Sequence, residues 1–170
     1  SDDFTNLPLL EDYSTTKLPI IVSCGMSDLA EVYQALDVIG TFEGYPTILL
    51  LCTSQYPTPP EDVNLLKLKT LASTFPDLVL GFSDHTKGSL ASSLAVGFGA
   101  VFFEKHFTLD NNLAGPDHWF SENPESLKDW VESIHQSYQM MGDALVRPTS
   151  KELEMRKLAR RSIVILKDTK

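Results

Sequence analysis

The sequence is poor in several kinds of residue, and each scarcity excludes a class of protein. Its 170 residues include two cysteines, Cys24 and Cys52, which argues against a disulfide framework and favours a reduced, cytoplasmic setting. No apolar run approaches the roughly 20 residues of a membrane-spanning helix, and no basic-then-apolar signal opens the chain. Basic residues number 14 against 23 acidic ones, and the formal charge of -9 argues against a nucleic-acid binder.

The chain does have enough hydrophobic residues, 42%, to form one globular domain with a core. Four short apolar runs alternate with segments that carry helical periodicity and capping residues. Such alternation is typical of an α/β protein with a parallel sheet. The predicted strands are Pro19–Cys24, Thr47–Cys52, Leu78–Ser83 and Ala100–His106, and the predicted helices are Asp28–Ile39, Glu61–Phe75, Ser89–Phe98 and Asn123–Met141.

Four strand–helix units make half of a (β/α)8 barrel or most of a doubly wound sheet. No Gly-rich phosphate-binding fingerprint follows any predicted strand, which weakens the doubly wound, nucleotide-binding alternative. The pattern changes after Gly142. Arg147–Ser150 is a turn-like break, and Lys151–Arg161 is a charged segment typical of a solvated helix or a linker. Ser162–Lys170 contains a strand-like run, and we expect the chain to be cut at both ends.

Two histidines are predicted to end neighbouring strands. His85 follows the third predicted strand, and His106 ends the fourth. Parallel neighbours lie about 4.8 Å apart, so both imidazoles are expected at the carboxyl end of the sheet, where barrel enzymes keep their chemistry. Two imidazoles there could hold one divalent ion such as Mn, Zn, Co or Fe, with Mg less natural. The alternative is two unrelated polar residues, because a separation of 21 positions is no short-range metal motif.

Other polar residues are expected at the same edge of the sheet. Ser23, Ser54 and Ser83 each end a predicted strand or directly follow one, and their hydroxyls could bind phosphate or carboxylate oxygens. Tyr56 lies in a proline-rich loop whose rigid shape could grip a substrate. Asp117, in the loop after the last predicted strand, could bind a sugar hydroxyl or act as an acid or base. The alternative for Asp117 is a simple turn former.

Five segments in order along the chain together resemble the N-acetylneuraminate (sialic acid) synthase family. They are Pro19–Met26, Cys52–Pro59, Gly81–Thr86, Glu104–Asp110 and Gly115–His118. The resemblance implies a (β/α)8 TIM barrel followed by a small antifreeze-like domain. It further implies condensation of phosphoenolpyruvate with an N-acylated amino sugar, such as N-acetylmannosamine, to give a nonulosonic acid and phosphate by C–O cleavage.

The resemblance also implies roles for individual residues. His85 and His106 match ligands of a divalent metal, Mn by preference and otherwise Mg or Co, and Asp3 matches an acidic catalytic position near the metal-bound water. Four serines match phosphoenolpyruvate contacts, and two other residues match amino-sugar contacts. The serines are Ser1, Ser23, Ser54 and Ser83, and the sugar contacts are Tyr56 and Asp117.

By this likeness, residues 1–146 are the C-terminal half of the barrel, about strands 5–8, and residues 147–170 are a linker and the start of a truncated antifreeze-like domain. We expect such a fragment to be inactive and unstable alone, or to pair with another half. We expect the full-length protein to be a cytoplasmic homodimer, as the resemblance implies. Trp119 and Phe120 depart from the family pattern and leave the sugar open. A synthase for pseudaminic acid, legionaminic acid or a spore-coat sugar is one alternative, and a non-catalytic sugar-binding relative is another.

Overall fold

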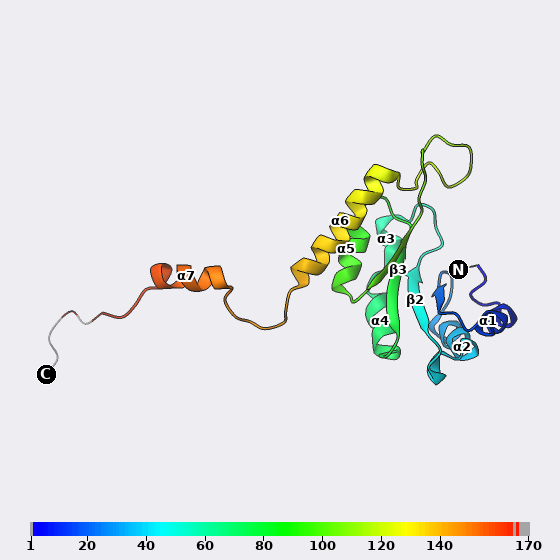
Figure 1. Cartoon of the computed structure of the whole chain (residues 1–170), viewed down its shortest axis with the longest axis horizontal. Coiled ribbons are helices and arrows are strands. Elements are labelled where there is room, and N and C mark those ends of the chain that lie inside the picture. The colour runs from blue at the N-terminus through cyan, green and yellow to red at the C-terminus, as the bar shows by residue number, and fades with distance from the viewer. Residues whose placement is uncertain (1, 165, 167–170) are drawn as a thin grey trace.

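A computed structural model describes residues 2–164 and residue 166 of the chain. Its α/β body carries a long C-terminal arm (Figure 1). The elements, in chain order, are α1 (Leu7–Ser14), β1 (Ile20–Ser23), α2 (Leu29–Ile39), the 3-10 helix η1 (Thr41–Glu43), β2 (Thr47–Cys52), α3 (Pro60–Val63), α4 (Lys67–Thr74), β3 (Val79–Asp84), α5 (Leu90–Gly97), β4 (Phe102–Lys105), α6 (Pro124–Met141) and α7 (Ser150–Ala159).

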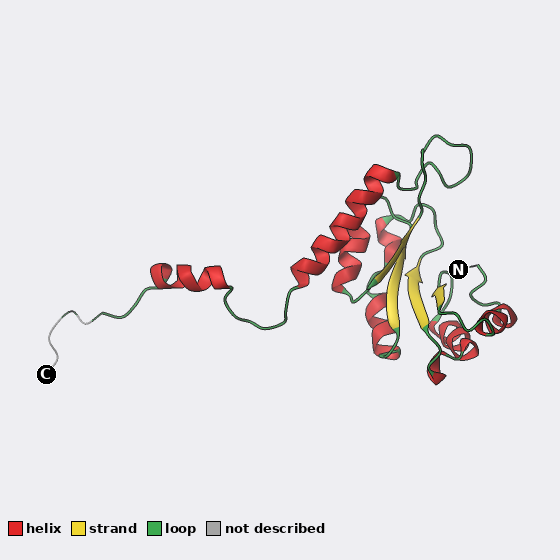
Figure 2. Ribbon diagram, viewed as in Figure 1, coloured by secondary structure: helices red, strands yellow, loops and turns green. Residues whose placement is uncertain are grey.

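The described strands form one four-stranded sheet in the order β1-β2-β3-β4, and every neighbouring pair is parallel. The sheet curls like half of a barrel, with helices packed along one side of it (Figure 2). The register places Ser83 of β3 beside Cys52 of β2 and Glu104 of β4. The prediction of a parallel α/β fold is therefore confirmed, and the carboxyl ends of β2, β3 and β4 meet at one edge.

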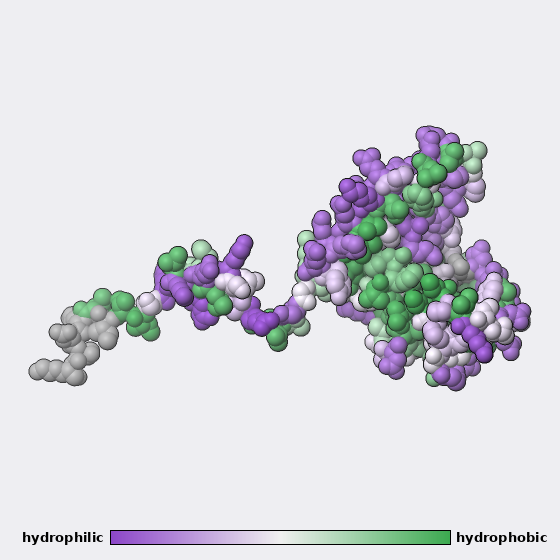
Figure 3. All heavy atoms as spheres, viewed as in Figure 1, coloured by the Kyte–Doolittle hydropathy of each residue, from purple (hydrophilic) through white to green (hydrophobic). Residues whose placement is uncertain are grey.

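The hydrophobic core lies between the helices and one face of the sheet. Alternate strand residues face the helices because side chains along a strand point to opposite faces. Those in the core cluster include Val22, Leu49, Leu51, Leu80 and Phe82, and they pack with buried residues of the helices such as Leu36, Leu68 and Ala95. The other strand residues point to the opposite face, which we call the inner face, and Figure 3 shows a hydrophobic area over the strands.

Capping residues explain where the two best-defined helices begin. Asp28 accepts a hydrogen bond from the Glu31 N–H, and the Glu31 carboxylate accepts one from the Asp28 N–H, so α2 starts with a capping box. Asn123 caps α6 in the same way with Ser126. Among the helices of the described residues, none is both long and apolar enough to span a membrane.

Two helix predictions differ from the structure. The single helix predicted over Glu61–Phe75 is two helices, α3 and α4, because Asn64 adopts a left-handed conformation with φ 49° and interrupts the helical path. The helix α1 was not predicted, although Asn6 at its N-cap and Pro8 in its first turn are residue types that favour a helix start; Asn6 makes no side-chain capping bond. The fourth strand is also shorter than predicted, Phe102–Lys105 in place of Ala100–His106.

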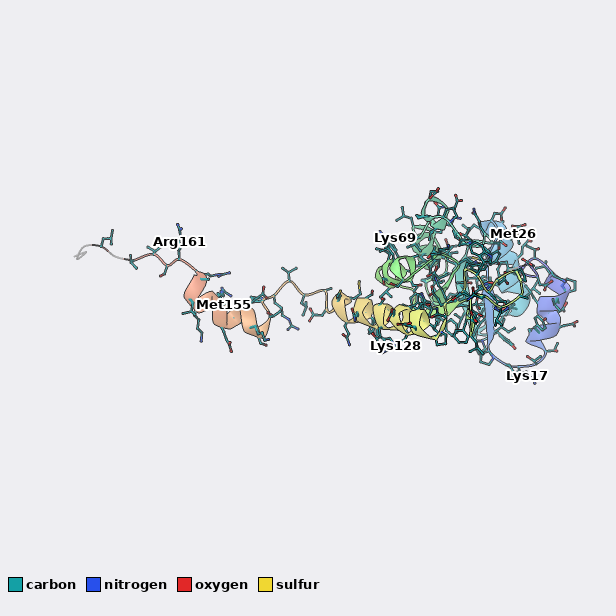
Figure 4. The ribbon with its side chains drawn as sticks, turned by 90° about the horizontal axis from the view of Figure 1, so that it is seen from above. Lys17, Met26, Lys69, Lys128, Met155 and Arg161 are labelled. Carbon is teal, nitrogen blue, oxygen red and sulfur yellow. The ribbon has the colours of Figure 1, made fainter. Side chains whose placement is uncertain are left out.

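The segment after α6 forms the arm. Helix α7 lies within the charged segment predicted as a solvated helix or linker, and none of its residues is buried. Met155 and Arg161 lie along this arm, far beyond Lys128 of α6 (Figure 4). The strand-like run predicted near the end is not a strand in its described residues, 162–164 and 166, and no β-pairing is described for it. An isolated strand has no partner for its backbone hydrogen bonds.

Candidate active site

The structure brings His85 and His106 together at the carboxyl edge of the sheet. Each follows its strand by one residue, β3 for His85 and β4 for His106. Their ring centroids are 5.1 Å apart, with the ring planes at 77°. Because His85 follows Asp84 and His106 follows Lys105, both rings lie on the same side of the sheet as Ser83 and Glu104. We call these two residues the histidine pair.

His85 is held as a neutral imidazole with one nitrogen left for another partner. Its Nδ1 lies 2.8 Å from the Thr53 carbonyl oxygen, which can only accept, so the proton is on Nδ1. Burial lowers the pKa of His85 below its usual value, which favours the neutral ring. Ser83 Oγ lies 3.4 Å from Nε2 but donates its one hydrogen to Glu104 at 2.7 Å. The Nε2 lone pair therefore stays available, as a metal ligand requires.

Tyr56 covers the histidine pair from the proline-rich loop. Its ring centroid lies 4.4 Å from that of His85 and 5.4 Å from that of His106. The Thr58 N–H donates a hydrogen bond of 2.8 Å to the His85 carbonyl oxygen and so ties this loop to the end of β3. The Tyr56–Pro57 peptide bond is cis. The proline-rich loop predicted to grip a substrate therefore lies against the histidine pair.

The long loop after β4 brings Asp117 to the other histidine. Asp117 Oδ2 lies 3.8 Å from His106 Nδ1, and the carboxylate is half exposed. The Asn111 side chain donates to the carbonyl oxygens of His118 and Ser121, both at 2.8 Å, and so shapes the loop. Phe120 from the same loop is buried, with its ring centroid 5.2 Å from that of His106. This arrangement leaves a charged oxygen at the open side of the histidine pair.

The remaining predicted site residues are Ser23, Ser54, Asp3 and Ser1. Ser23 ends β1 and Ser54 follows β2 by two residues, so both lie at the carboxyl edge and both are partly buried. Asp3 lies in the turn before α1, where its carbonyl oxygen accepts from the Asn6 N–H. No described contact joins the Asp3 side chain to the histidine pair. Ser1 lies outside the described residues.

The sequence argument missed Glu104 and the buried pair of Asp84 and Lys105. Glu104 stands two residues before His106, so strand alternation could have placed it on the face of the histidine pair. Asp84 and Lys105 are neighbours in the register and point to the opposite face, where Lys105 Nζ lies 3.2 Å from Asp84 Oδ2. No short sequence motif signals that pairing.

The histidine pair fits a metal ion in its donor type but supplies only two nitrogens. No group of three or more His, Cys, Asp or Glu side chains in the described part of the chain is arranged to hold a metal. Any ion bound by His85 Nε2 and by His106 would therefore take its other ligands from water or substrate oxygens. Imidazole with oxygen ligands suits Mn, Zn, Co or Fe.

A parallel α/β half-barrel with imidazoles and a carboxylate at its carboxyl edge defines a protein of the barrel-enzyme class. A model of the NeuB family matches residues 1–145, and the chain belongs to that family.

Proteins named as sugar-acid synthases are similar to this chain along nearly its whole length. The N,N'-diacetyllegionaminic acid synthase of Legionella pneumophila subsp. pneumophila is 45% identical over 172 residues, which is 99% of this chain and 48% of the relative. The human N-acetylneuraminate-9-phosphate synthase is 35% identical over 154 residues, 90% of this chain and 41% of that protein. The chain therefore spans about half the length of the curated relatives it matches.

A solved structure shows the same architecture. The N-acetylneuraminic acid (sialic acid) synthetase from Leptospira borgpetersenii serovar Hardjo-bovis, in complex with citrate, superposes with a TM-score of 0.80 at 34% identity. The match covers 94% of this chain and 56% of that one.

Proposed function

We propose that the protein containing this chain is a sialic-acid-type synthase, which condenses phosphoenolpyruvate with an N-acylated amino sugar to give a nonulosonic acid and phosphate. The observation that carries the proposal is the meeting of His85, His106 and Tyr56 at the carboxyl edge of a parallel half-barrel. Membership of the NeuB family and the synthase names of the relatives support it.

His85 and His106 hold the divalent metal, and synthases of this family generally depend on one. When bound, the metal acts as a Lewis acid that withdraws electron density from the sugar aldehyde. His85 suits this position because its Nδ1 is occupied by the Thr53 carbonyl and its Nε2 points away from that bond. Mn is the proposed ion, with Mg or Co as alternatives.

The serines at the carboxyl edge hold phosphoenolpyruvate in this proposal. Ser23 is the last residue of β1, and Ser83 is the next-to-last residue of β3 on the other side of β2. Ser54 follows β2 by two residues, and Ser1 completes the proposed set. Hydroxyl groups suit phosphate and carboxylate oxygens because they donate hydrogen bonds to anions without adding charge. Ser83 already donates to Glu104, so substrate binding would require that hydrogen to turn.

Tyr56, Asp117 and Asp3 bind and orient the amino sugar. Tyr56 offers a ring face and a hydroxyl above the histidine pair, and Asp117 offers a half-exposed carboxylate beside His106. C3 of phosphoenolpyruvate forms the new bond to the aldehyde carbon, and the aldehyde oxygen gains a proton. Water adds to C2 and loses a proton to a base, for which Asp3 is the proposed group. The C–O bond to phosphate then breaks, phosphate leaves with the bonding pair and carries away a proton, and the C2 hydroxyl, having lost that proton, becomes the ketone of the 2-oxo acid.

The acceptor sugar is proposed as N-acetylmannosamine or a close relative. The 45% identity with a diacetyllegionaminic acid synthase favours a diacetylated amino sugar as the main alternative, with the same chemistry and a different aldehyde. A pseudaminic acid synthase is also similar, at 38% identity over 168 residues.

The wider organisation of the protein is part of the proposal. Residues 1–146 are the C-terminal half of the barrel, with β1 to β4 as its strands 5–8, and residues 147–170 are a linker and the start of an antifreeze-like domain. The full-length protein works in the cytoplasm as a homodimer. The matches to about half the length of each relative support this division of the chain.

Phosphate release tests the function directly. The longest natural protein that contains this chain is assayed with phosphoenolpyruvate and N-acetylmannosamine, with and without Mn²⁺, beside a His85→Ala/His106→Ala variant. Metal-dependent release that the variant lacks is the expected result. Release only with another amino sugar changes the substrate, and silence with every aldehyde from a folded protein leaves a non-catalytic sugar-binding relative.

A further inference from the structure

A buried cluster of three charged side chains lies directly behind the histidine pair. Lys105 Nζ is 3.2 Å from Asp84 Oδ2 and 3.6 Å from Glu122 Oε1. The exposed fractions of these three side chains are 3%, 0% and 9%. Charges removed from water are costly unless they are paired and hydrogen-bonded. We call Asp84, Lys105 and Glu122 the charge cluster.

Two members of the charge cluster, Asp84 and Lys105, each stand one residue before a histidine and point to the opposite side of the sheet. Asp84 precedes His85, Lys105 precedes His106, and Asp84 and Lys105 are partners in the register of β3 and β4. Strand side chains alternate between faces, so each charge points toward the helices while its neighbouring imidazole points to the rim. A contact between Asp84 and Lys105 therefore sets the spacing of the two strand ends that carry the imidazoles.

The lysine also holds the backbone that follows the first histidine. Lys105 Nζ donates to the carbonyl oxygens of Thr86 at 2.6 Å and Gly88 at 3.1 Å. Asp84 Oδ1 accepts from the Thr86 N–H and hydroxyl, both at 2.8 Å. His85 is thus enclosed between two residues whose positions depend on the same ion pair.

Glu122 connects the cluster to the second histidine through its backbone, while its carboxylate pairs with Lys105. Its N–H donates to the His106 carbonyl oxygen, and its carbonyl oxygen accepts from the Thr108 N–H, both at 2.9 Å. The helices anchor the cluster from behind, because Asp84 Oδ2 accepts from Ser92 Oγ of α5 at 2.5 Å and from Trp130 Nε1 of α6 at 3.4 Å. No buried side-chain polar atom in the described residues lacks a partner, so the network is complete.

We propose that Asp84, Lys105 and Glu122 are positioning residues that fix the separation and direction of the two imidazoles for metal binding. The inference rests on the proposed function for its metal and deepens it by assigning the residues that hold the ligands. An aspartate and a lysine placed only for stability would not need to fix Thr86, the residue that follows His85, through three separate hydrogen bonds. Groups that orient metal ligands typically change metal affinity by about 10- to 100-fold when they are removed.

Metal titration of folded variants tests the inference. In the longest natural protein that contains this chain, Mn²⁺ affinity is measured by calorimetry for wild type, Lys105→Met, Lys105→Arg and Asp84→Asn/Lys105→Met. The double variant removes both charges of the Asp84–Lys105 pair, so that the fully buried Asp84 carboxylate no longer faces an apolar side chain and only the Glu122 carboxylate loses its cationic partner. Leu36→Ala is the matched control, since Leu36 is fully buried in α2 and belongs to the core cluster.

We expect Mn²⁺ to bind about tenfold more weakly to Lys105→Met and to the double variant, with Lys105→Arg recovering part of the affinity. Leu36→Ala should lower the melting temperature and leave the affinity unchanged. Wild-type affinity in the folded double variant would overturn the inference, as would equal weakening by Leu36→Ala or an absence of Mn²⁺ binding in the wild type. Weakened binding in a protein that releases no phosphate with any sugar would reject the proposed function and keep the positioning role.

Discussion

At the scale of single residues, Gly81 shows how tightly the strands are packed on the inner face. A Cβ built on Gly81 would lie 2.4 Å from Leu50 Cδ2 and 2.4 Å from the Phe102 carbonyl oxygen. The side chain of Leu50 could turn, but the backbone of β4 could not move without disturbing the sheet. Glycine at this position therefore allows the close approach of two neighbouring strands.

We expect Gly81→Ala to lower the free energy of unfolding by about 1–3 kcal/mol or more, because overpacking of a filled site costs that much. Gly97→Ala is the matched control, since its new Cβ would make an ordinary contact of 3.9 Å with Met141 Sδ and alanine favours helices. Urea unfolding of both variants measures the difference. Equal stability of the two would contradict the packing argument.

Cys24 gives the stability of the fold a dependence on alkaline pH. Burial raises the pKa of its thiol from 9.0 to about 11, partly offset by a backbone hydrogen bond. A thiol that ionises later in the folded state contributes stability that is complete below pH 9 and lost as the pH rises toward 11. We expect the stability difference between wild type and Cys24→Ala to be constant up to pH 9 and to shrink above it, as urea unfolding from pH 8 to 10.5 would measure. A difference that stays constant over this range would count against the shift.

The sequence predicted which side chains meet at the carboxyl edge of the sheet where the strand ends could be located. His85, His106 and Ser83 were placed by the rule that a polar residue after an apolar run ends at the sheet edge, and the structure brings them together. Glu104 and Lys105 were missed because both were treated as part of one motif, although alternation sends them to opposite faces. The contact of Lys105 with Glu122 depends on the path of the loop over residues 108–122, and no local sequence pattern specifies that path.

At the scale of elements, helix ends were predicted better than helix interruptions. Asp28 and Asn123 are capping residues with a partner three positions on, so the starts of α2 and α6 could be read from the sequence. The break at Asn64 was harder to predict, because residues 61–75 contain neither glycine nor proline and the apolar spacing continues across the break. Asparagine is one of the few residues that tolerate the left-handed conformation, and that tolerance was the available signal.

The cap of α6 is expected to stabilise both the helix and the loop beside the site. Asn123 Oδ1 accepts from the N–H groups of Glu125 and Ser126, and its Nδ2 donates to Asn111 Oδ1 at 3.2 Å. We expect Asn123→Ala to cost about 1 kcal/mol, and Asn123→Asp to cost less because it keeps the cap. Thermal melts of the two variants compare them. An aspartate variant as unstable as the alanine variant would show that the bond to Asn111 matters more than the cap.

At the scale of the whole molecule, the sheet has two edges and an inner face without a covering layer in the described residues. β1 and β4 each have a described neighbour on one side only. Ile21 and Val79, whose register places them on the inner face, are 48% and 44% exposed. Open edges and apolar faces of this kind promote association. Alternation of strands and helices predicted the sheet, but it could not show how far the sheet closes.

We expect the 170-residue chain alone to be inactive, and to be unstable or to associate through its inner face. Gel filtration with light scattering and a thermal melt of the isolated chain would measure this. A monodisperse monomer that unfolds cooperatively and does not associate through its inner face would contradict the expectation. The longest natural protein that contains the chain, studied in the same buffer, is the control.

The alternation of Asp84 with His85 and of Lys105 with His106 has a consequence for inherited variation. Loss of a single codon within Val79–Asp84 would turn each later side chain to the other face, and would send an imidazole into the core and a carboxylate to the rim. The loop over residues 108–122 has no such alternation of side chains. Its length could therefore change by one residue without turning the side chains of a strand to the opposite face of the sheet. In a library of one-codon deletions, the end of β3 should be among the least tolerant stretches of the gene.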